Sequence, residues 1–186
     1  MTSRNKDTYV TSYYTETDKG NVITTNSMNE TTFGIIPVRK HEGKNIFLLV
    51  RSQQGNWGFP KGHPEKNEAP MFTARRELEE ETGITDLVLF PQTFSEARVM
   101  VEADFTATKV VIWFLGMING SPEVNIKDTN EISEYKWLRF DDAYELLTHD
   151  ETKRVMLDVR LYLAKYETSD TTAEEQFFAP VQQKPA

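Results

Sequence analysis

The sequence predicts an α+β fold in which a mixed β-sheet lies between helices. Short apolar runs of strand length and amphipathic stretches of helical period follow one another without strict strand–helix–strand alternation. The chain has 186 residues, of which 38% are hydrophobic and 27% charged. That length and composition are sufficient for one globular domain with a complete core.

The strands are expected where apolar residues gather between turn signals. Residues 32–38 and 46–51 are joined by a turn at 41–45 and should form a hairpin. Residues 109–118 (KVVIWFLGMI) give the strongest strand pattern, which predicts a central place in the sheet, after a loop at 102–108. Shorter strands are expected at residues 57–59, 87–90, 94–101 and 134–139.

The first helix has clear start and stop signals. Pro70 is tolerated in a first helical turn, because its missing N–H would have no partner there. Gly83 suits the left-handed position that follows a helix end. Between them, Met71, Ala74 and Leu78 recur at helical spacing and should form the face that packs on the core.

The remaining chain divides into helices and terminal segments. Asp141 should cap a helix that runs to about residue 147, and residues 152–166 should form another amphipathic helix. Residues 1–30 are rich in Thr, Ser and Asn and are expected to be mobile. The domain should therefore cover residues 31–166, followed by a polar tail at 167–186.

The overall composition narrows the class of protein. No apolar run reaches the length of a membrane span, and the N-terminus lacks the pattern of a secretory signal, so a cytoplasmic protein is expected. The absence of cysteine excludes disulfides and thiolate metal sites. The net charge of −8 disfavours general nucleic-acid binding, and the oligomeric state is left open.

The first helix carries a dense acidic face. Glu77, Glu80 and Glu81 are three and four residues apart, so their carboxylates share one side of the helix and repel one another. A hard divalent cation such as Mg²⁺ or Mn²⁺ would compensate this repulsion. Arg76 lies one turn before Glu80 and is expected to pair with it.

The acidic face belongs to a longer pattern. The pattern reads Gly62, five residues, Glu68, seven residues, Arg76-Glu77-Leu78, one residue, Glu80-Glu81, one residue, and Gly83-Ile84. It resembles the Nudix box, G-x5-E-x7-R-E-U-x-E-E-x-G-U, at every fixed position. The alternative, that the acids merely form a solvated helix face, is disfavoured by so complete a match. The resemblance implies an α/β/α sandwich and metal-dependent hydrolysis of a nucleoside diphosphate linked to another group.

The resemblance also implies roles for individual residues. Arg76 and Glu68 would orient the site, the main-chain carbonyl of Lys61 would be a further metal ligand, and Glu79 would be solvated. The last strand follows a loop in which Glu131 would supply another metal-binding or basic carboxylate, with Glu134 as the rival. The carboxylate ligands carried over from the box are Glu77, Glu80 and Glu81.

Residues outside the box indicate a subfamily. Residues 57–63 (WGFPKGH) resemble the asymmetric dinucleoside tetraphosphate hydrolases, and the resemblance continues over about residues 32–166. It implies cleavage of diadenosine tetraphosphate to ATP and AMP, with phosphate contacts from Lys61, Lys109 and His63. Tyr162 would stack on adenine, although packing in the core is an equal alternative. A tyrosine that this family often has in the loop at 102–108 is missing here.

Three other functions are weighed against this one. An RNA 5′-pyrophosphohydrolase or decapping enzyme uses the same box, but the net charge disfavours RNA. A diphosphoinositol polyphosphate hydrolase would need a dense basic pocket, for which this chain offers only Arg39, Lys40, Lys44 and Arg51. A binding module without catalysis would be expected to lose glutamates of the box, and none is lost here.

Overall fold

The computed structural model describes residues 9–16, 22–102, 105–127 and 129–169. In this part of the chain, eight strands form one sheet, and three helices pack beside it. The strands are β1 (Tyr9–Glu16), β2 (Val22–His41), β3 (Lys44–Ser52), β4 (Trp57–Gly58), β5 (Lys61–Gly62), β6 (Leu87–Glu102), β7 (Phe105–Ile118) and β8 (Ile132–Arg139). The helices are α1 (Pro70–Thr82), α2 (Phe140–Leu146) and α3 (Asp150–Ser169).

The sheet is mixed, as predicted. Its main order is β4-β3-β2-β7-β6, so β7 lies in the interior, as its apolar sequence indicates. β2 and β7 run parallel, from the pair Asn26–Phe105 to the pair Val38–Met117, whereas β3 and β6 are antiparallel to these neighbours. The predicted hairpin is formed by β2 and β3, and β8 adds to the free side of β3.

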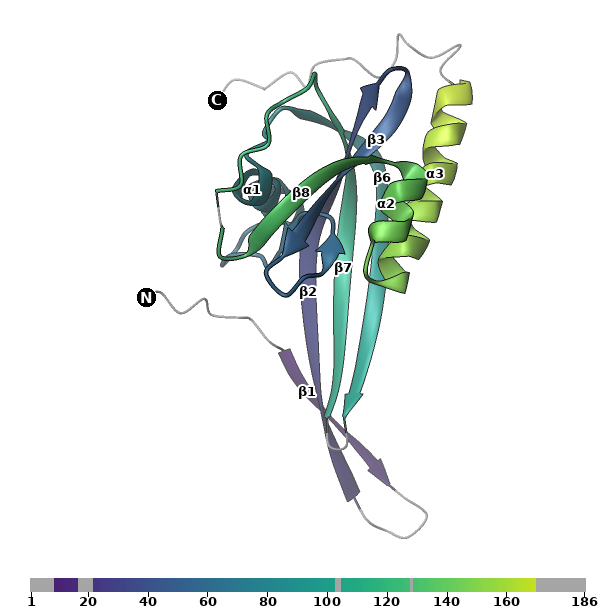
Figure 1. Ribbon diagram of the computed structural model, residues 1–186. Helices are drawn as coiled ribbons and strands as arrows, with labels where there is room; N and C mark the ends of the chain where they lie inside the picture. The colour runs from purple at the N-terminus through teal and green to yellow at the C-terminus, as the bar shows by residue number, and fades with distance from the viewer. Residues whose placement is uncertain (1–8, 17–21, 103–104, 128, 170–186) are drawn as a thin grey trace, which may run out of the picture.

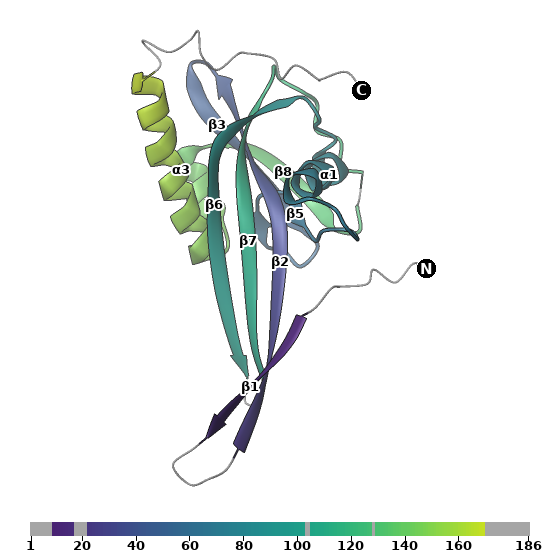
Figure 2. The same ribbon diagram turned by 180° about the vertical axis from the view of Figure 1, so that it is seen from behind.

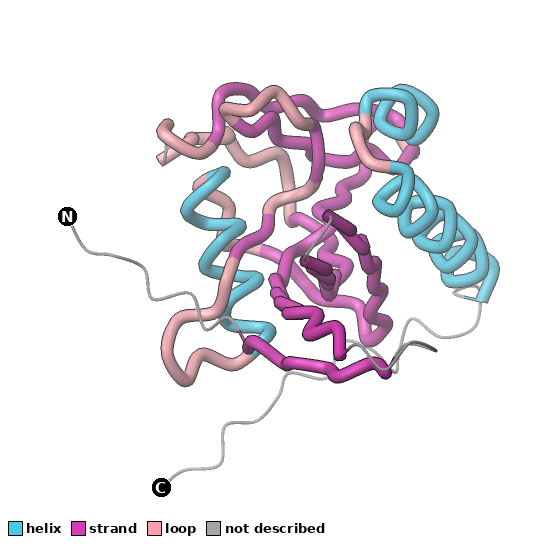
Figure 3. Tube along the Cα trace, turned by 90° about the horizontal axis from the view of Figure 1, so that it is seen from below, coloured by secondary structure: helices cyan, strands magenta, loops and turns pink. Residues whose placement is uncertain are grey.

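The helices cover both faces of the sheet, which makes an α/β/α sandwich (Figures 1 and 3). Successive strand residues point to opposite faces, so Ile35 and Leu48 pack beneath α1, whereas Ile36 and Leu49 belong to the core on the side of α2 and α3. The α1 side is completed by Ala74, Leu78, Ile84, Leu87, Ile118 and Val124. The other side includes Trp113, Leu115, Ala143, Met156, Val159 and Leu163.

Helix α1 begins and ends as its sequence predicts. Pro70 is its first residue, and Gly83 adopts φ 75° after its end, where its N–H donates to the Glu79 carbonyl at 2.8 Å. Leu78 is completely buried. The expectation that Met71 faces the core is wrong, because this side chain is 42% exposed and Thr73 takes the buried position in that turn.

Several strands are longer than predicted. Residues 87–90 and 94–101 form one strand, β6, whose pairing with β7 shifts register between Leu89 and Thr93. The expected loop at 102–108 is already part of β7 from Phe105 onward. These extensions arise from pairing with neighbouring strands, which apolar content alone does not reveal.

The N-terminal segment also differs from expectation. Residues 9–16 and 22–30, for which no strand was expected, form β1 and the first half of β2. β1 pairs antiparallel with β2, and β2, β7 and β6 extend together beyond the helices (Figures 1 and 2). The domain boundary at residue 31 is therefore crossed by a continuous strand, whereas the mobility of this segment stays a prediction.

The C-terminal helices need smaller corrections. Arg139, not Asp141, precedes the first turn of α2, and Asp141 lies within that turn, where an acid suits the helix dipole. α3 runs from Asp150 to Ser169, beyond the expected span at both ends. The remaining tail, residues 170–186, lies outside the described residues. No described helix has the length and apolar character that a membrane crossing requires.

Gly34 allows β5 to pass close to the sheet beneath the acidic helix. It pairs with Lys61 of β5 on one side and with Trp113 of β7 on the other. A Cβ atom at Gly34 would lie 2.4 Å from the Pro60 carbonyl oxygen and 2.5 Å from the Trp113 ring. Both are far inside van der Waals contact, so only glycine fits without displacement of the backbone.

We expect Gly34→Ala to lower the free energy of unfolding by about 1–3 kcal/mol, because the added methyl group overpacks this junction. Gly58→Ala is the matched control, since a Cβ at Gly58 meets nothing within 4 Å. Urea denaturation of both variants measures the difference. Equal stability of the two variants would contradict this account of the junction.

Candidate active site

Three carboxylates, two from α1 and one from the loop before β8, lie close together. Glu77 and Glu81 project from α1, and Glu131 lies immediately before β8. One carboxylate oxygen from each lies within 4.8 Å of the others. Glu77 and Glu81 are only 3% and 5% exposed, whereas Glu131 is exposed. The structure therefore joins the predicted late-loop glutamate to two glutamates of the box.

The glycine of the box makes room for this cluster. Gly62 of β5 lies against Glu77, and a Cβ atom there would be 2.1 Å from the Glu77 Oε1 atom. Any larger residue would push the carboxylate out of its place. The spacing between Gly62 and Glu77 in the sequence thus reflects direct contact between the loop and the helix.

The electrostatics of the cluster favour a bound cation. Burial raises the pKa of the Glu77 carboxyl, and burial also raises the pKa of Glu81, to about 8. The charges of Glu77 and Glu131 raise the Glu81 pKa further, while Lys61 lowers it. Within the described structure, the buried Oε2 atom of Glu81 has no hydrogen-bond partner. A buried oxygen without a donor, beside two other carboxylates, fits a divalent cation.

Arg76 holds the surroundings of the cluster in place. Its Nε and Nη2 atoms donate to the two oxygens of Glu68, each at 3.0 Å, and Nη2 also donates to the His63 carbonyl at 2.9 Å. Its Nη1 atom donates to Glu77 at 2.8 Å and to Glu80 at 3.0 Å. The predicted pairing of Arg76 with Glu80 is confirmed. The hydrogen bonds from Arg76 hold the pKa of Glu68 at about 2.

Glu80 lies at the border of the cluster. It is not part of the three-carboxylate group, and its side chain is 42% exposed and bound to Arg76. Glu80 nevertheless lies next to Glu77, because both accept hydrogen bonds from the same Nη1 atom of Arg76. Its role as a metal ligand stays a prediction. Glu79 points away from the cluster and pairs with Lys127 at 2.8 Å, consistent with its expected place on the helix surface.

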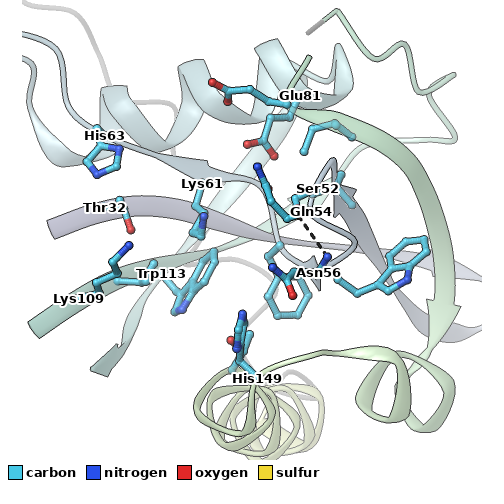
Figure 4. Close-up of a pocket in the computed structure, with 18 of the residues that line it drawn as sticks. Thr32, Ser52, Gln54, Asn56, Lys61, His63, Glu81, Lys109, Trp113 and His149 are labelled. Carbon is cyan, nitrogen blue, oxygen red and sulfur yellow. Dashed lines mark hydrogen bonds between the residues drawn. The ribbon is translucent and has the colours of Figure 1, made fainter. Parts of the chain in front are cut away.

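The cluster borders a cavity of about 490 Å³ (Figure 4). Glu81 of α1 and His149, which precedes α3, lie on opposite sides of this cavity, with Lys61 between them in the view of Figure 4. The floor is formed by β2 and β7, including Thr32 and Trp113. The cavity thus extends from the carboxylates across the sheet to the start of α3.

The basic residues expected to contact phosphate all line this cavity. Lys61 lies near Glu81, whose pKa it lowers. Lys109 pairs with Glu30 at 3.2 Å, and His63 bonds to the other oxygen of Glu30. Burial tends to raise the pKa of Glu30, but the hydrogen bonds and charges of Lys109 and His63 lower it overall. Glu30 was missed from the sequence because it lies in the segment expected to be mobile.

Tyr162 of α3 lies outside the cavity lining and is partly buried against the core. Its ring makes edge-on contacts with Phe90 and Phe94, with centroids 5.9 and 6.0 Å apart. The structure thus matches the core-packing alternative and does not bring this residue to the other predicted site residues. The aromatic rings that do line the cavity are those of Trp57, Phe59 and Trp113.

Sequence reasoning also missed residues at the far end of the cavity. Arg98 of β6, together with His149 and Thr152 from the start of α3, lines that end. No motif marks them, because they lie in segments distant from the box. Strand alternation predicts that Glu96 and Arg98 share an outward face, but it does not reveal that this face borders a cavity. The outward position is wrong for Glu96, which is only 5% exposed because Arg98 covers it.

The geometry thus places an acidic cluster on a helix beside a cavity that basic side chains also line, an arrangement suited to hold a divalent cation next to an anionic substrate. The family model described as NUDIX domain matches residues 28–159, which is more than half of the chain, so the protein belongs to the Nudix family of hydrolases. Members of this family generally use divalent metal cations.

Individual relatives agree with this membership. The chain is 29% identical over 140 residues to the bis(5′-nucleosyl)-tetraphosphatase [asymmetrical] of Rattus norvegicus, which spans 70% of this chain and 92% of the rat protein. It is 32% identical over 155 residues to a putative mRNA-decapping protein of Acanthamoeba polyphaga mimivirus, covering 76% of this chain but 40% of the viral protein. The structure of a C. elegans Ap4A hydrolase binary complex is 26% identical, with a TM-score of 0.64, and covers 73% of this chain and 98% of that one.

We expect the metal-free protein to lose stability as the pH rises from about 4.5 to about 8. The unfolded chain ionises Glu81 at its ordinary pKa, whereas the folded state keeps it protonated, so the unfolded state binds fewer protons across this range. Glu77, whose pKa is also raised, adds to the same trend. Urea denaturation in a chelator across this range measures the slope.

Glu81→Gln should flatten that slope, since an amide does not ionise. Addition of a divalent cation to the unsubstituted protein should restore stability most at the upper end of the pH range. A slope that is identical in Glu81→Gln would show that the buried carboxyl does not cause it.

Proposed function

We propose that the protein hydrolyses diadenosine tetraphosphate asymmetrically, to ATP and AMP, with Mg²⁺ or Mn²⁺ as cofactor. The observation that carries the proposal is one cavity that joins a three-carboxylate cluster to Lys61, Lys109 and His63. In such a cavity, a cation held by the carboxylates would bind one part of a polyphosphate, and the basic side chains would bind the rest. The similarity to asymmetric tetraphosphatases over most of their length supports the same substrate.

In this proposal Glu77, Glu81 and Glu131 would hold the cation. A bound cation neutralises phosphate charge and activates a water nucleophile. The deep burial of Glu77 and Glu81 favours cation binding over simple hydration, because these two carboxylates gain little stabilisation from solvent. The main-chain carbonyl of Lys61, which lies in the neighbouring strand β5, is kept as a proposed further ligand. Arg76 acts through Glu77, whose carboxylate it orients.

The basic side chains would bind the phosphates that surround the bond to be broken. Lys61 lies between the cluster and the rest of the cavity, and Lys109 lies farther along the sheet. A carboxylate of the cluster would accept the proton that the attacking water releases, which contributes about 10²–10⁴-fold in comparable reactions. Glu30 keeps Lys109 and His63 in place until substrate enters.

A second candidate is hydrolysis at the 5′ end of RNA. It is favoured by the 32% identity to the putative mRNA-decapping protein and by 27% identity to an RNA pyrophosphohydrolase of Pelagibacter ubique. A diphosphoinositol polyphosphate substrate is less favoured. In the described structure, the basic residues expected for it do not line the cavity: Arg39, Lys40, Lys44 and Arg51.

Incubation with Mg²⁺ and diadenosine tetraphosphate should give ATP and AMP in equal amounts, because water attacks one end of the phosphate chain. Chromatography of the products measures this directly. A parallel incubation uses a 5′-triphosphorylated RNA. Release of phosphate or pyrophosphate from the RNA, with no ATP from the dinucleotide, would overturn the first proposal in favour of the second.

Glu81→Gln should lower turnover by about 100-fold or more, because a neutral amide ligates a cation poorly. It should also weaken binding of Mn²⁺, followed by calorimetry, without loss of the fold. Glu79→Gln is the control: it removes the same charge two residues away, from a side chain that is 48% exposed and paired with Lys127. Equal activity of the two variants would exclude Glu81 as a ligand.

A further inference from the structure

We propose that Arg98 forms, together with Lys109, a second phosphate-binding site at the far end of the cavity, which binds phosphate groups distant from the carboxylate cluster. This inference rests on the proposed function, since it concerns how the same cavity accommodates a polyphosphate. In this proposal, Arg98 is the residue that makes the enzyme sensitive to the length of the phosphate chain.

The strand register places these two cations side by side. Arg98 of β6 lies directly opposite Lys109 of β7, and Lys109 lies beside Glu30 of β2. Residues in register project from the same face of a sheet, and all three line the cavity. Like charges in directly opposite positions destabilise a strand pair, and here Glu30 offsets Lys109 while Glu96 offsets Arg98. A phosphate group bound between the two cations would offset their repulsion directly.

The guanidinium of Arg98 contacts two acids, one from β6 and one from α3. Its Nη2 atom donates to Glu96 Oε1 at 2.8 Å, and its Nε atom lies 4.0 Å from Glu151 Oε2. In the described structure, the contact with Glu96 is the only hydrogen bond of the Arg98 side chain. Donors therefore remain on a side chain that is 25% exposed and borders the cavity. A fixed guanidinium fork with spare donors suits a phosphate group.

The charge of Arg98 acts on the opposite wall of the cavity. Burial lowers the pKa of His149, and the charge of Arg98 lowers it further. The effect of Arg98 thus reaches a residue of a different element across the cavity end. The charges of Glu96 and Glu151 act on His149 in the opposite direction, so removal of Glu96 should strengthen the effect of Arg98 at this end of the cavity.

The competing explanation is that Arg98 serves only to neutralise Glu96. Glu96 is 5% exposed, and its Oε2 atom has no hydrogen-bond partner within the described residues, so a simple Arg98 substitution would leave a buried, uncompensated carboxylate. Such a variant would lose stability whichever explanation holds. The double variant Glu96→Gln with Arg98→Gln removes both charges together and separates the two explanations.

Binding of inorganic tripolyphosphate, measured by calorimetry without divalent cations, tests the site independently of the reaction. We expect the double variant to bind tripolyphosphate about tenfold more weakly than the unsubstituted protein. Glu96→Gln alone should bind at least as tightly, because Arg98 then loses a competing anion. Arg154→Gln, which removes an exposed arginine of α3 outside the cavity lining, controls for the loss of an arginine elsewhere on the surface and should leave binding unchanged. The double variant itself keeps the net charge, because it removes one acid and one base.

Kinetics complete the test. With diadenosine tetraphosphate, the double variant should show a raised KM with nearly unchanged kcat, and a smaller rise in KM with diadenosine triphosphate. Tripolyphosphate binding equal to that of the unsubstituted protein, or no measurable binding by either, would overturn the second site. If no dinucleotide is hydrolysed by the unsubstituted protein, the proposed function fails, whereas the tripolyphosphate measurement still decides the role of Arg98.

Discussion

Repulsion among buried carboxylates on one helix is the constraint on which the active-site side of the molecule depends. Glu77 and Glu81 are removed from water and placed beside Glu131, so their ionised forms are unfavourable in the metal-free protein. Arg76 offsets part of this repulsion and anchors the loop through Glu68 and the His63 carbonyl. The contact between Gly62 and Glu77 restricts the remaining movement of the Glu77 side chain. Because a bound cation would relieve the repulsion that remains, this arrangement of carboxylates is suited to bind one.

The second constraint is the parallel pairing of β2 with β7. One continuous strand carries Glu30 at the cavity, Gly34 at the junction with β5 and Ile35 in the core. Glu30 and Lys109 at the cavity and the apolar residues of the same two strands are therefore positioned by one set of backbone hydrogen bonds. This pairing places part of the polar cavity directly beside the core.

Sequence reasoning was accurate where a residue's role is local or belongs to a spaced motif. The limits of α1, the left-handed Gly83 and the pairing of Arg76 with Glu80 followed from helical periodicity and capping. The meeting of Glu131 with the helix followed only from family resemblance, since no local rule joins residues so far apart. Tyr162 was ambiguous because a helical aromatic residue has the same spacing whether it packs in a core or faces a ligand.

The long pairing of β2 with β7 has an evolutionary consequence. The pairs Glu30–Lys109 and Gly34–Trp113 lie in the same uninterrupted register. An inserted or deleted residue between Glu30 and Gly34 would turn one set of side chains to the opposite face of the sheet. In relatives of this chain, the residues of β2 and β7 at the cavity and in the core can therefore be substituted, but the number of residues between them cannot change. We expect length variation in relatives of this chain to accumulate beyond these strands, in the turns and at the ends.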